Sequence, residues 1–546
     1  MSKKNNNANF LVQGSILAAA SIITRIIGLL YRIPLTNIIG NKGNGIYSAG
    51  FEIYSILLLL SSYSLPLAVS KLVSARVARG ERRNAHRIFQ CAMVFAVTIG
   101  LIFSVFTFVC SDFLASKVMT SPMSRFSLQN LAPTIFFVAV MGVLRGYFQG
   151  LGTMLPTAVS QIIEQIINAI VSVGAAWYLF SYGTKVGKLL DNEDYGPAFG
   201  AGGGTMGTNL GALAGLLFLI FLFFAYRKTL KRQLRRDKTR KKEDYGSIFY
   251  ILMITIIPVI LSTAVYNISA VLDQGIFNKV MAAQGQKDYN AIWGVFSGKY
   301  RLLTNVPISI ASALASSTIP SLTAAMASRN RRAVQQKTAM AIRFIMVIAI
   351  PCAVGLTVLA SPILRLLWGD TSKLAANLLK YGSISVVFYS MSTLTNGILQ
   401  GINKMRIPVR NACIALVLHL GVLAVMLCGF KMHIYAVVYA NIFFAFMMTV
   451  LNSLAIGRYL RYRQEMRRTF VIPAICAGFM GIFIYFVYKL LESVAGNAIA
   501  TLVSIVLGAV VYFIALLLLK GITEEELMNM PKGRILVKAA KGLHLM

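Results

Sequence analysis

Long apolar segments recur along this chain and constrain its fold more than any other feature. An α-helix needs about 20 predominantly apolar residues to cross the hydrocarbon core of a bilayer. Segments of that length lie near 10–38, 45–76, 86–110, 127–150, 156–181, 203–226, 247–279, 291–320, 334–360, 379–401, 408–430, 433–457, 470–491 and 497–520. Because no water satisfies backbone groups inside a bilayer, we predict an all-α, polytopic membrane protein with about 14 transmembrane helices.

The charge balance agrees with a membrane protein. Only 13% of the 546 residues are charged, whereas soluble proteins carry about 25%. The formal net charge of +35 would suggest a nucleic-acid partner in a soluble protein, but here the basic residues form short runs between apolar segments. Such runs are typical of the cytoplasmic loops of membrane proteins. We therefore expect contact with membrane lipids and no nucleic acid.

The basic runs follow the even-numbered helices. They lie at 76–83, 227–242, 329–332, 404–406 and 458–463, whereas the loops after odd-numbered helices contain few Lys or Arg residues. The positive-inside rule places the basic loops, and with them both termini, on the cytoplasmic side. We interpret the run at 227–242 as a solvated linker, with contact to anionic lipids as the alternative.

An internal repeat relates the two halves of the chain. Phe148–Pro156 after the fourth helix recurs as Leu399–Pro408 after the tenth, and Gly45–Tyr47 resembles Ala291–Trp293. The offset of about 250 residues corresponds to six helices, so the two halves have the same orientation in the membrane. Two such bundles around a central cavity suggest a transporter that works by alternating access.

The repeat predicts the domain organisation. We expect an N-terminal six-helix bundle at 1–226, a basic cytoplasmic linker at 227–246, a C-terminal six-helix bundle at 247–457, helices 13 and 14 at 458–520, and a cytoplasmic tail at 521–546.

Two arginines lie within the first predicted helix. Arg25 is near its middle, and Arg32 follows seven residues later. Seven residues make two helical turns, so both side chains project from one face about 10 Å apart. Gly28 lies between them and leaves room for a bulky group. We predict that this face binds substrate.

Other charged residues within the predicted helices are Glu52, Arg145, Glu164, Asp273, Lys299 and Arg301. Each basic group at the bilayer centre costs about 2.5–3.5 kcal/mol on insertion scales, so it should face a wet cavity or pair with a carboxylate. We predict that the basic residues of this set bind substrate and that the acidic residues are charge partners or coupling groups.

Other roles are open for these basic residues. Arg32, Lys299 and Arg301 could merely join helices by pairing with Glu52 and Asp273. Lys299 and Arg301 lie roughly 200° apart around a helix, so they cannot both face one site. Arg145, close to the cytoplasmic end of its helix, could reach the membrane surface.

Polar stripes run along the fifth and tenth helices. The first contains Gln161, Glu164, Gln165, Asn168 and Ser172, and the second contains Ser385, Tyr389, Ser392 and Asn396. Such stripes are more typical of interhelical hydrogen bonds than of a substrate track, although both would fit a hydrated cavity. The glycine-rich stretch 200–207 lacks the lysine of a P-loop and predicts close helix packing.

Prolines inside the predicted helices provide candidate hinges. Pro34, Pro66, Pro258 and Pro307 lie in helices one, two, seven and eight, the pairs that correspond in the two halves. A proline frees a backbone carbonyl and kinks a membrane helix, so either a hinge or a fixed curvature is expected.

The sequence offers no pattern for catalysis or for a metal site. The six cysteines are scattered through apolar segments, and the four histidines are far apart. Neither a disulfide framework nor a zinc site is supported. We expect no enzyme activity, no catalytic residue and no bound cofactor, apart from a coupling ion of unknown identity.

Several segments resemble one family of membrane transporters. Ser21–Pro34, Leu65–Ser74, Gly207–Gly211 and Pro307–Ser309 are similar to the SpoVB-like branch of polysaccharide exporters. This branch includes the MurJ-type lipid II flippases of Gram-positive bacteria and belongs to the multidrug/oligosaccharidyl-lipid/polysaccharide superfamily. The resemblance extends over essentially the whole chain.

The resemblance implies a cationic central cavity for the pyrophosphate and sugars of an undecaprenyl-linked precursor, and a groove for the lipid tail in the last two helices. The arginines of the family's first helix correspond to Arg25 and Arg32, and its basic position in helix eight to Lys299 or Arg301. The basic residue of helix two is not matched, because Glu52 occupies that depth.

The function expected from this resemblance is flipping of an undecaprenyl-pyrophosphate-linked cell-wall precursor, lipid II in the first place, from the cytoplasmic to the outer leaflet of a bacterial cytoplasmic membrane. The alternatives are a flippase for another lipid-linked polysaccharide and a cation-coupled multidrug exporter. Cell-wall synthesis machinery is a candidate partner of the first function.

Overall fold

A computed structural model describes residues 2–62, 64–237, 239, 242–327, 330–402 and 404–522 of the chain. These residues are largely helical and include no β-strand. They divide into two compact units, Met1–Gly298 (unit 1) and Lys299–Met546 (unit 2), and each unit has its own apolar core. The predicted all-α architecture is confirmed.

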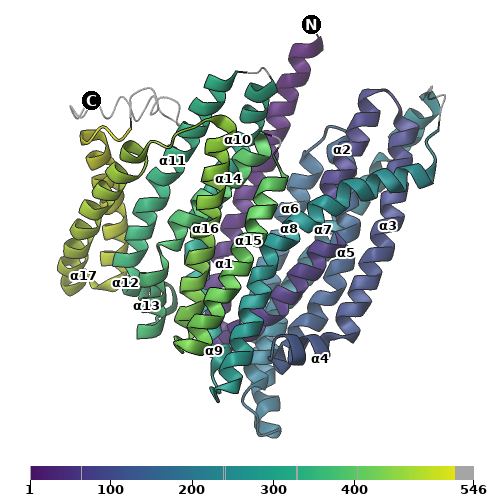
Figure 1. The fold of residues 1–546 in the computed structure, drawn as a ribbon. Helices are drawn as coiled ribbons and strands as arrows, with labels where there is room; N and C mark the ends of the chain where they lie inside the picture. Colours follow the sequence, from purple (N-terminus) through teal and green to yellow (C-terminus); the bar gives the residue numbers. More distant parts are fainter. Residues whose placement is uncertain are drawn as a thin grey trace. The chain divides into compact units, whose positions relative to one another are not determined.

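Unit 1 contains the first eleven elements of the chain (Figure 1). They are α1 (Ser2–Ser61), α2 (Leu65–Ala78), α3 (Arg82–Val109), α4 (Ser111–Phe113), the π-turn η1 (Leu114–Val118), the 3₁₀ turn η2 (Pro122–Ser124), α5 (Arg125–Gly150), α6 (Leu155–Leu189), α7 (Tyr195–Arg236), α8 (Tyr245–Ala283) and α9 (Tyr289–Val295). The π-turn η3 (Phe296–Tyr300) leads into unit 2.

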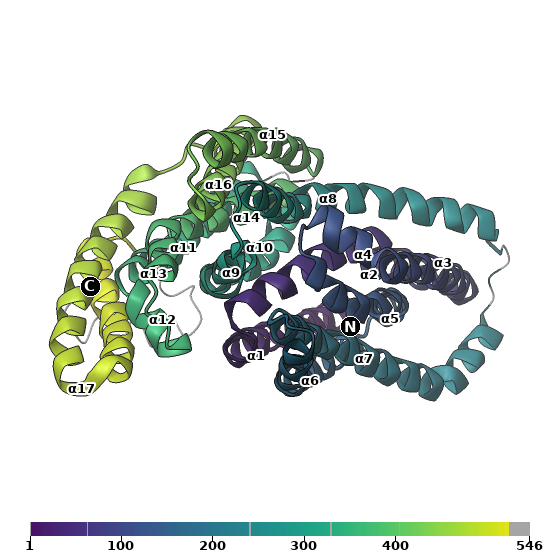
Figure 2. The same cartoon turned by 90° about the horizontal axis from the view of Figure 1, so that it is seen from below.

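Unit 2 contains the remaining helices, which Figure 2 shows from below. They are α10 (Arg301–Ala327), α11 (Arg331–Val358), α12 (Ala360–Trp368), α13 (Lys373–Gly382), α14 (Ser385–Gly401), α15 (Arg406–Ala424), the π-turn η4 (Val425–Gly429), α16 (Ile434–Leu460), the π-turn η5 (Arg467–Val471) and α17 (Ile472–Leu518). The predicted tail lies outside the described residues from 523 onward.

Nine helical segments of the described chain are long and apolar enough to cross a membrane. Two of them, Ala19–Ala78 and Arg467–Leu518, are long enough for two crossings each. Gly40 (φ 67°) and Gly496 (φ 74°) interrupt the helical backbone of these segments. Only glycine adopts such angles without steric cost, which is why the breaks fall there. Together with α8, α10 and α14, these segments account for the predicted number of about 14 membrane helices.

The seventh membrane helix packs with unit 1, which differs from the domain boundary predicted at 227–246. Ile248, Leu252 and Ile256 of α8 are buried in the same apolar cluster as residues of α2, α3, α5 and α7. The predicted linker is also shorter than expected, because α7 continues to Arg236 before the chain leaves the helix.

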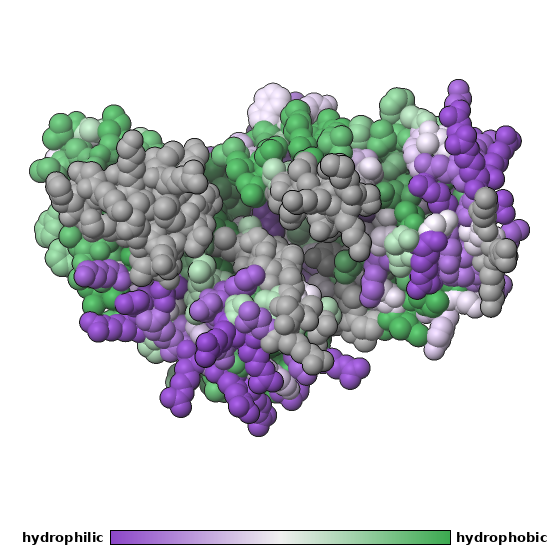
Figure 3. All heavy atoms as spheres, turned by 90° about the horizontal axis from the view of Figure 1, so that it is seen from above, coloured by the Kyte–Doolittle hydropathy of each residue, from purple (hydrophilic) through white to green (hydrophobic). Residues whose placement is uncertain are grey.

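Polar contacts hold the connection between α7 and α8 against the end of α2 and the start of α3. Arg76 pairs with Glu243 at 3.0 Å, and the backbone N–H of Arg83 donates to Asp237 at 2.5 Å. Burial would raise the pKa of Asp237, but hydrogen bonds from Thr239 and Arg83 lower it below 3.8. Figure 3 shows hydrophilic residues gathered over this part of unit 1.

Glycines bring α6 and α7 into close contact. A Cβ atom added to Gly207 would lie 2.5 Å from the carbonyl oxygen of Asn168, and one added to Gly203 would lie 2.5 Å from that of Ala175. Side-chain-free positions let two membrane helices approach until their backbones touch. The close packing predicted for the glycine-rich stretch is therefore confirmed.

This packing generates a stability prediction. Gly207→Ala places a methyl group into the α6 backbone, and overpacking of this kind costs about 1–3 kcal/mol. Thermal unfolding of the purified protein in detergent should show a lower Tm for this variant. The matched control is Gly174→Ala on α6, where nothing lies within 4 Å of the added Cβ atom. Equal Tm values for the two variants would contradict the proposed tight contact.

Candidate functional site

The two arginines of α1 lie on the helical segment before the break at Gly40. Arg25 is exposed on the protein surface, and Arg32 is partly buried. A Cβ atom at Gly28 would lie only 3.2 Å from the side-chain amide nitrogen of Gln165. The space that we expected beside Gly28 is therefore partly filled by Gln165 of α6.

Aromatic rings, rather than carboxylates, hold the guanidinium group of Arg32. Its Cζ atom lies 4.4 Å from the ring centre of Tyr47 and 5.7 Å from that of Phe51. Glu52 acts on Arg32 electrostatically, but Arg32 forms no ion pair with a carboxylate within the described part of the chain. Cation–π contacts fix the position of the group without using its N–H donors.

Neighbouring polar groups come from α6. The side-chain amide of Asn168 donates to the hydroxyl of Tyr31 at 3.5 Å, and the hydroxyl of Ser172 donates to the carbonyl oxygen of Gly204 at 2.7 Å. Part of the predicted stripe on α6 thus joins helices.

Arg145 is paired within the helix bundle. It bonds to Glu164 at 2.8 Å, and its Nε atom donates to the hydroxyl of Ser160 at 2.9 Å. This pair neutralises both charges and joins α5 to α6. The geometry favours an interhelical contact over the surface-reaching position that we considered for Arg145.

Lys299 is also paired, with a partner that we did not predict. Its ammonium group bonds to Asp370, and the two side chains are only 8% and 11% exposed. Lys299 lies in the π-turn η3, and Asp370 lies between α12 and α13. A structural ion pair was one of the two roles open for Lys299, and its partner is Asp370 rather than Asp273.

Arg301 and Asp273 lie in different units. Arg301 begins α10 in unit 2 and is partly buried. Asp273 is buried in α8 of unit 1 beside Gln274, which accepts a hydrogen bond from Ser48 at 3.1 Å and donates to the carbonyl oxygen of Gly45 at 3.2 Å.

The stripe on α14 also joins helices. Tyr389 donates to Asn441 at 2.9 Å, and Asn452 donates to Asn396 at 2.6 Å; both partners belong to α16. The hydroxyl groups of Ser385 and Tyr300 are 3.1 Å apart. These contacts favour interhelical bonding over a substrate track in unit 2.

The candidate hinge prolines differ in their local setting. Pro34 lies inside α1, Pro66 is in the first turn of α2, and Pro307 is buried within α10. The side chain of Pro258 lies outside the described residues. The first turn of a helix tolerates proline without a kink, so Pro66 shapes the start of α2. A hinge role of these residues stays a prediction.

The geometry of the Lys299–Asp370 pair predicts a large effect of removing one partner. Asp370→Asn should leave a buried ammonium group without its counter-charge, which costs about 3–5 kcal/mol. Thermal unfolding in detergent should show a clearly lower Tm for this variant and little change in Tm for Asp288→Asn, an exposed control. The double variant Lys299→Gln/Asp370→Asn should recover part of the loss. No recovery would contradict a direct interaction.

The same pair predicts a pH dependence. Burial would raise the pKa of Asp370, but hydrogen bonds from Lys299 and Ser372 lower it below 3.8. A carboxylate whose pKa is lowered in the folded protein stabilises the fold fully at any pH above its pKa in the unfolded chain. This stabilisation is lost as the pH falls through the lowered pKa of the folded state. The Tm difference between the unmodified protein and Asp370→Asn should be constant from pH 7 to about 4 and shrink below that. A difference that already disappears near pH 6 would rule out this assignment.

Comparison with known proteins identifies the family. Residues 11–326 match the family described as polysaccharide biosynthesis protein, which is more than half of the chain. The chain belongs to this family. Residues 301–426 also match the MatE family. No group of three or more His, Cys, Asp or Glu residues within the described part of this family member could hold a metal ion.

Two curated relatives come from Bacillus subtilis (strain 168). Stage V sporulation protein B is 25% identical over 536 residues, which cover 97% of this chain and 99% of the relative. Lipid II flippase MurJ is 26% identical over 429 residues, which cover 75% and 76% of the two chains.

A solved structure confirms the fold. The lipid II flippase MurJ in an inward closed conformation matches with a TM-score of 0.65 and 15% identity, over 91% of this chain and 97% of that one. The chain is thus a multi-pass membrane protein with a transporter fold of the MurJ and MATE type.

Proposed function

We propose that the chain flips an undecaprenyl-pyrophosphate-linked cell-wall precursor, lipid II, from the cytoplasmic to the outer leaflet of the bacterial cytoplasmic membrane. The lipid-linked precursor and the surrounding lipids are then its partners, and both termini are cytoplasmic. Support for the substrate comes from the relatives, one of which bears the name of a lipid II flippase.

The observation that carries this proposal is the state of Arg32. Its guanidinium group rests on the rings of Tyr47 and Phe51 without an ion pair to a described carboxylate. Arg32 also has a side-chain hydrogen bond with Tyr31. A guanidinium group carries five N–H donors, so others are left for a ligand, and such groups bind phosphate oxygens through paired hydrogen bonds. A pyrophosphate at membrane depth is a ligand of matching charge and geometry.

The other basic residues take different roles in this proposal. Arg25, two turns away on α1, is the second pyrophosphate contact. Arg145 and Lys299 are already neutralised by Glu164 and Asp370, so each supports the helices of its own unit. The cycle then exposes the Arg25 and Arg32 face to one leaflet and afterwards to the other by alternating access.

Two alternatives have their own support. The match of residues 301–426 to the MatE family favours a multidrug exporter. Such an exporter needs acidic groups to hold a cationic drug, but Glu164, one of the acidic residues within the helices, is paired with Arg145. The match of residues 11–326 to the family described as polysaccharide biosynthesis protein favours a flippase for another lipid-linked polysaccharide.

A lipid II accessibility assay on reconstituted protein tests the proposal. Arg32→Ala and Arg25→Ala should each lower flipping about 10-fold or more, because a charged hydrogen bond contributes about 1.5–3 kcal/mol. Arg32→Lys should restore only part of the activity, since an ammonium group lacks the planar fork.

The control is Arg410→Ala, an exposed arginine on α15. It should flip lipid II at the unmodified rate. Unimpaired flipping by both Arg25→Ala and Arg32→Ala would refute the pyrophosphate role. Export of cationic dyes without any effect on lipid II would favour the multidrug alternative.

A further inference from the structure

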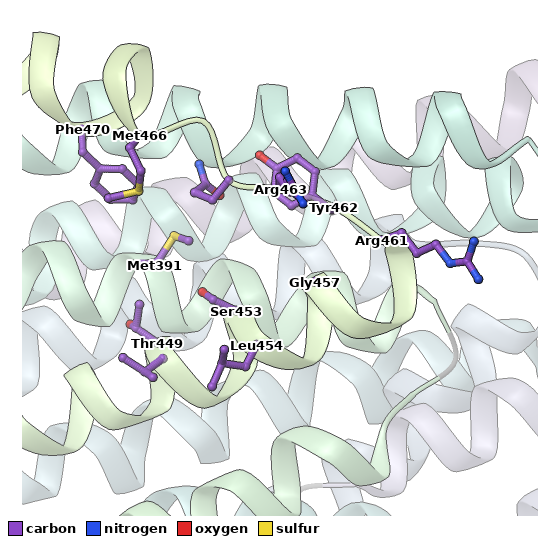
Figure 4. A pocket seen from close by; sticks show the side chains of 12 residues that line it. Met391, Thr449, Ser453, Leu454, Gly457, Arg461, Tyr462, Arg463, Met466 and Phe470 are labelled. Atoms are coloured by element: carbon purple, nitrogen blue, oxygen red, sulfur yellow. The ribbon is translucent and has the colours of Figure 1, made fainter.

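Unit 2 contains a pocket of about 680 Å³ at the end of α16. Its walls come from Met391 of α14, from α16, from the non-helical connection 461–465, and from Met466 and Phe470 at the start of the next helical segment (Figure 4). The connection is held in place from α11, because the side-chain amide of Gln335 donates to the carbonyl oxygen of Leu460 at 2.7 Å. The pocket is therefore formed by anchored segments.

The pocket combines an apolar interior with a basic rim. The apolar lining residues are Met391, Val450, Leu454, Met466 and Phe470, and the rim carries Arg461, Arg463 and Gln464. Leu454 and Met466 are 66% and 59% exposed, so the apolar part is continuous with the surface that faces lipid. An acyl chain can thus enter the pocket directly from the bilayer.

The positive charges of the two arginines at the rim are not neutralised by a neighbouring carboxylate. Neither Arg461 nor Arg463 forms an ion pair with a described carboxylate. The nearby acid, Glu465, is bonded to Arg343 and lies 3.7 Å from Arg468. In Figure 4, Arg463 lies beside Tyr462, while Arg461 projects outward from the end of α16. The rim is therefore attractive to an anion.

One polar group in the pocket lacks a partner. The hydroxyl of Tyr462, which lines the pocket, is buried and has no hydrogen bond to any described residue. A buried hydroxyl without a partner costs about 1–3 kcal/mol, so such groups normally receive one from a ligand or water. A phosphate oxygen at the rim would accept this hydrogen bond.

We propose that this pocket binds an acidic glycerophospholipid from the leaflet at the basic end of unit 2. One acyl chain lies along Leu454 and Phe470, and the phosphate is held by Arg463 with a hydrogen bond from Tyr462, while Arg461 adds positive charge at the rim. Basic pockets between membrane helices on the cytoplasmic side bind anionic headgroups in this way. The site lies outside the substrate face in unit 1 and does not depend on the proposed function.

Native mass spectrometry of the delipidated full-length protein tests the site. With phosphatidylglycerol, the unmodified protein should bind one lipid that Arg461→Gln/Arg463→Gln binds about 10- to 30-fold more weakly, because each arginine near an anionic lipid contributes about 1 kcal/mol. Ser453→Phe, which narrows the apolar part without changing the charge, should weaken the same binding event. The matched control Arg235→Gln/Arg236→Gln removes two exposed charges from the end of α7 and should bind normally.

Three results would overturn the proposal. Equal binding of phosphatidylcholine by the unmodified protein would show that the rim does not select an anionic headgroup. Competition by inorganic phosphate alone would show that no acyl chain is bound. If undecaprenyl pyrophosphate, but not phosphatidylglycerol, requires Arg461 and Arg463, the pocket belongs to the transport route.

Discussion

Hydrocarbon cannot solvate a charge, and the arrangement of charged side chains in this protein follows from that constraint. Arg145 and Lys299 are neutralised by carboxylates, each across two elements of one unit. Arg32 is held by the rings of Tyr47 and Phe51 and by a hydrogen bond with Tyr31 instead of a carboxylate, so its charge is not neutralised by an ion pair. The difference separates two basic residues that are neutralised within the fold from Arg32, on which the proposed binding of an anionic ligand depends.

The two units join their helices by different means. In unit 1, glycines such as Gly207 bring α6 and α7 close enough for Ser172 to bond to the backbone of α7. In unit 2, Asn452 of α16 accepts a hydrogen bond from Asn411 at 2.9 Å and donates to Asn396. Both solutions replace the hydrophobic effect, which does not drive association between helices that are already in lipid.

Much of the fold could be predicted because membrane spans depend on local sequence. A run of apolar residues determines a span whatever its neighbours are, and the breaks inside the two longest helices fall on glycines, Gly40 and Gly496. The candidate site was predicted only in part. Arg32 could be predicted as a site residue from its depth in the helix. Its contacts with the rings of Tyr47 and Phe51 could not, because they require that the two segments of α1 pack together.

Sequence alone determined that this chain is a helical membrane protein with basic side chains buried in its spans, because hydropathy and charge are properties of single residues and short windows. Tertiary structure decided which of those basic side chains form ion pairs with carboxylates and which do not. Lys299 meets Asp370 only because η3 and the turn between α12 and α13 come together, although 71 residues separate them in the chain. Distance in space, not order in the sequence, sets the energy of an ion pair, so Arg32 could be told apart from Lys299 and Arg145 only in the folded protein.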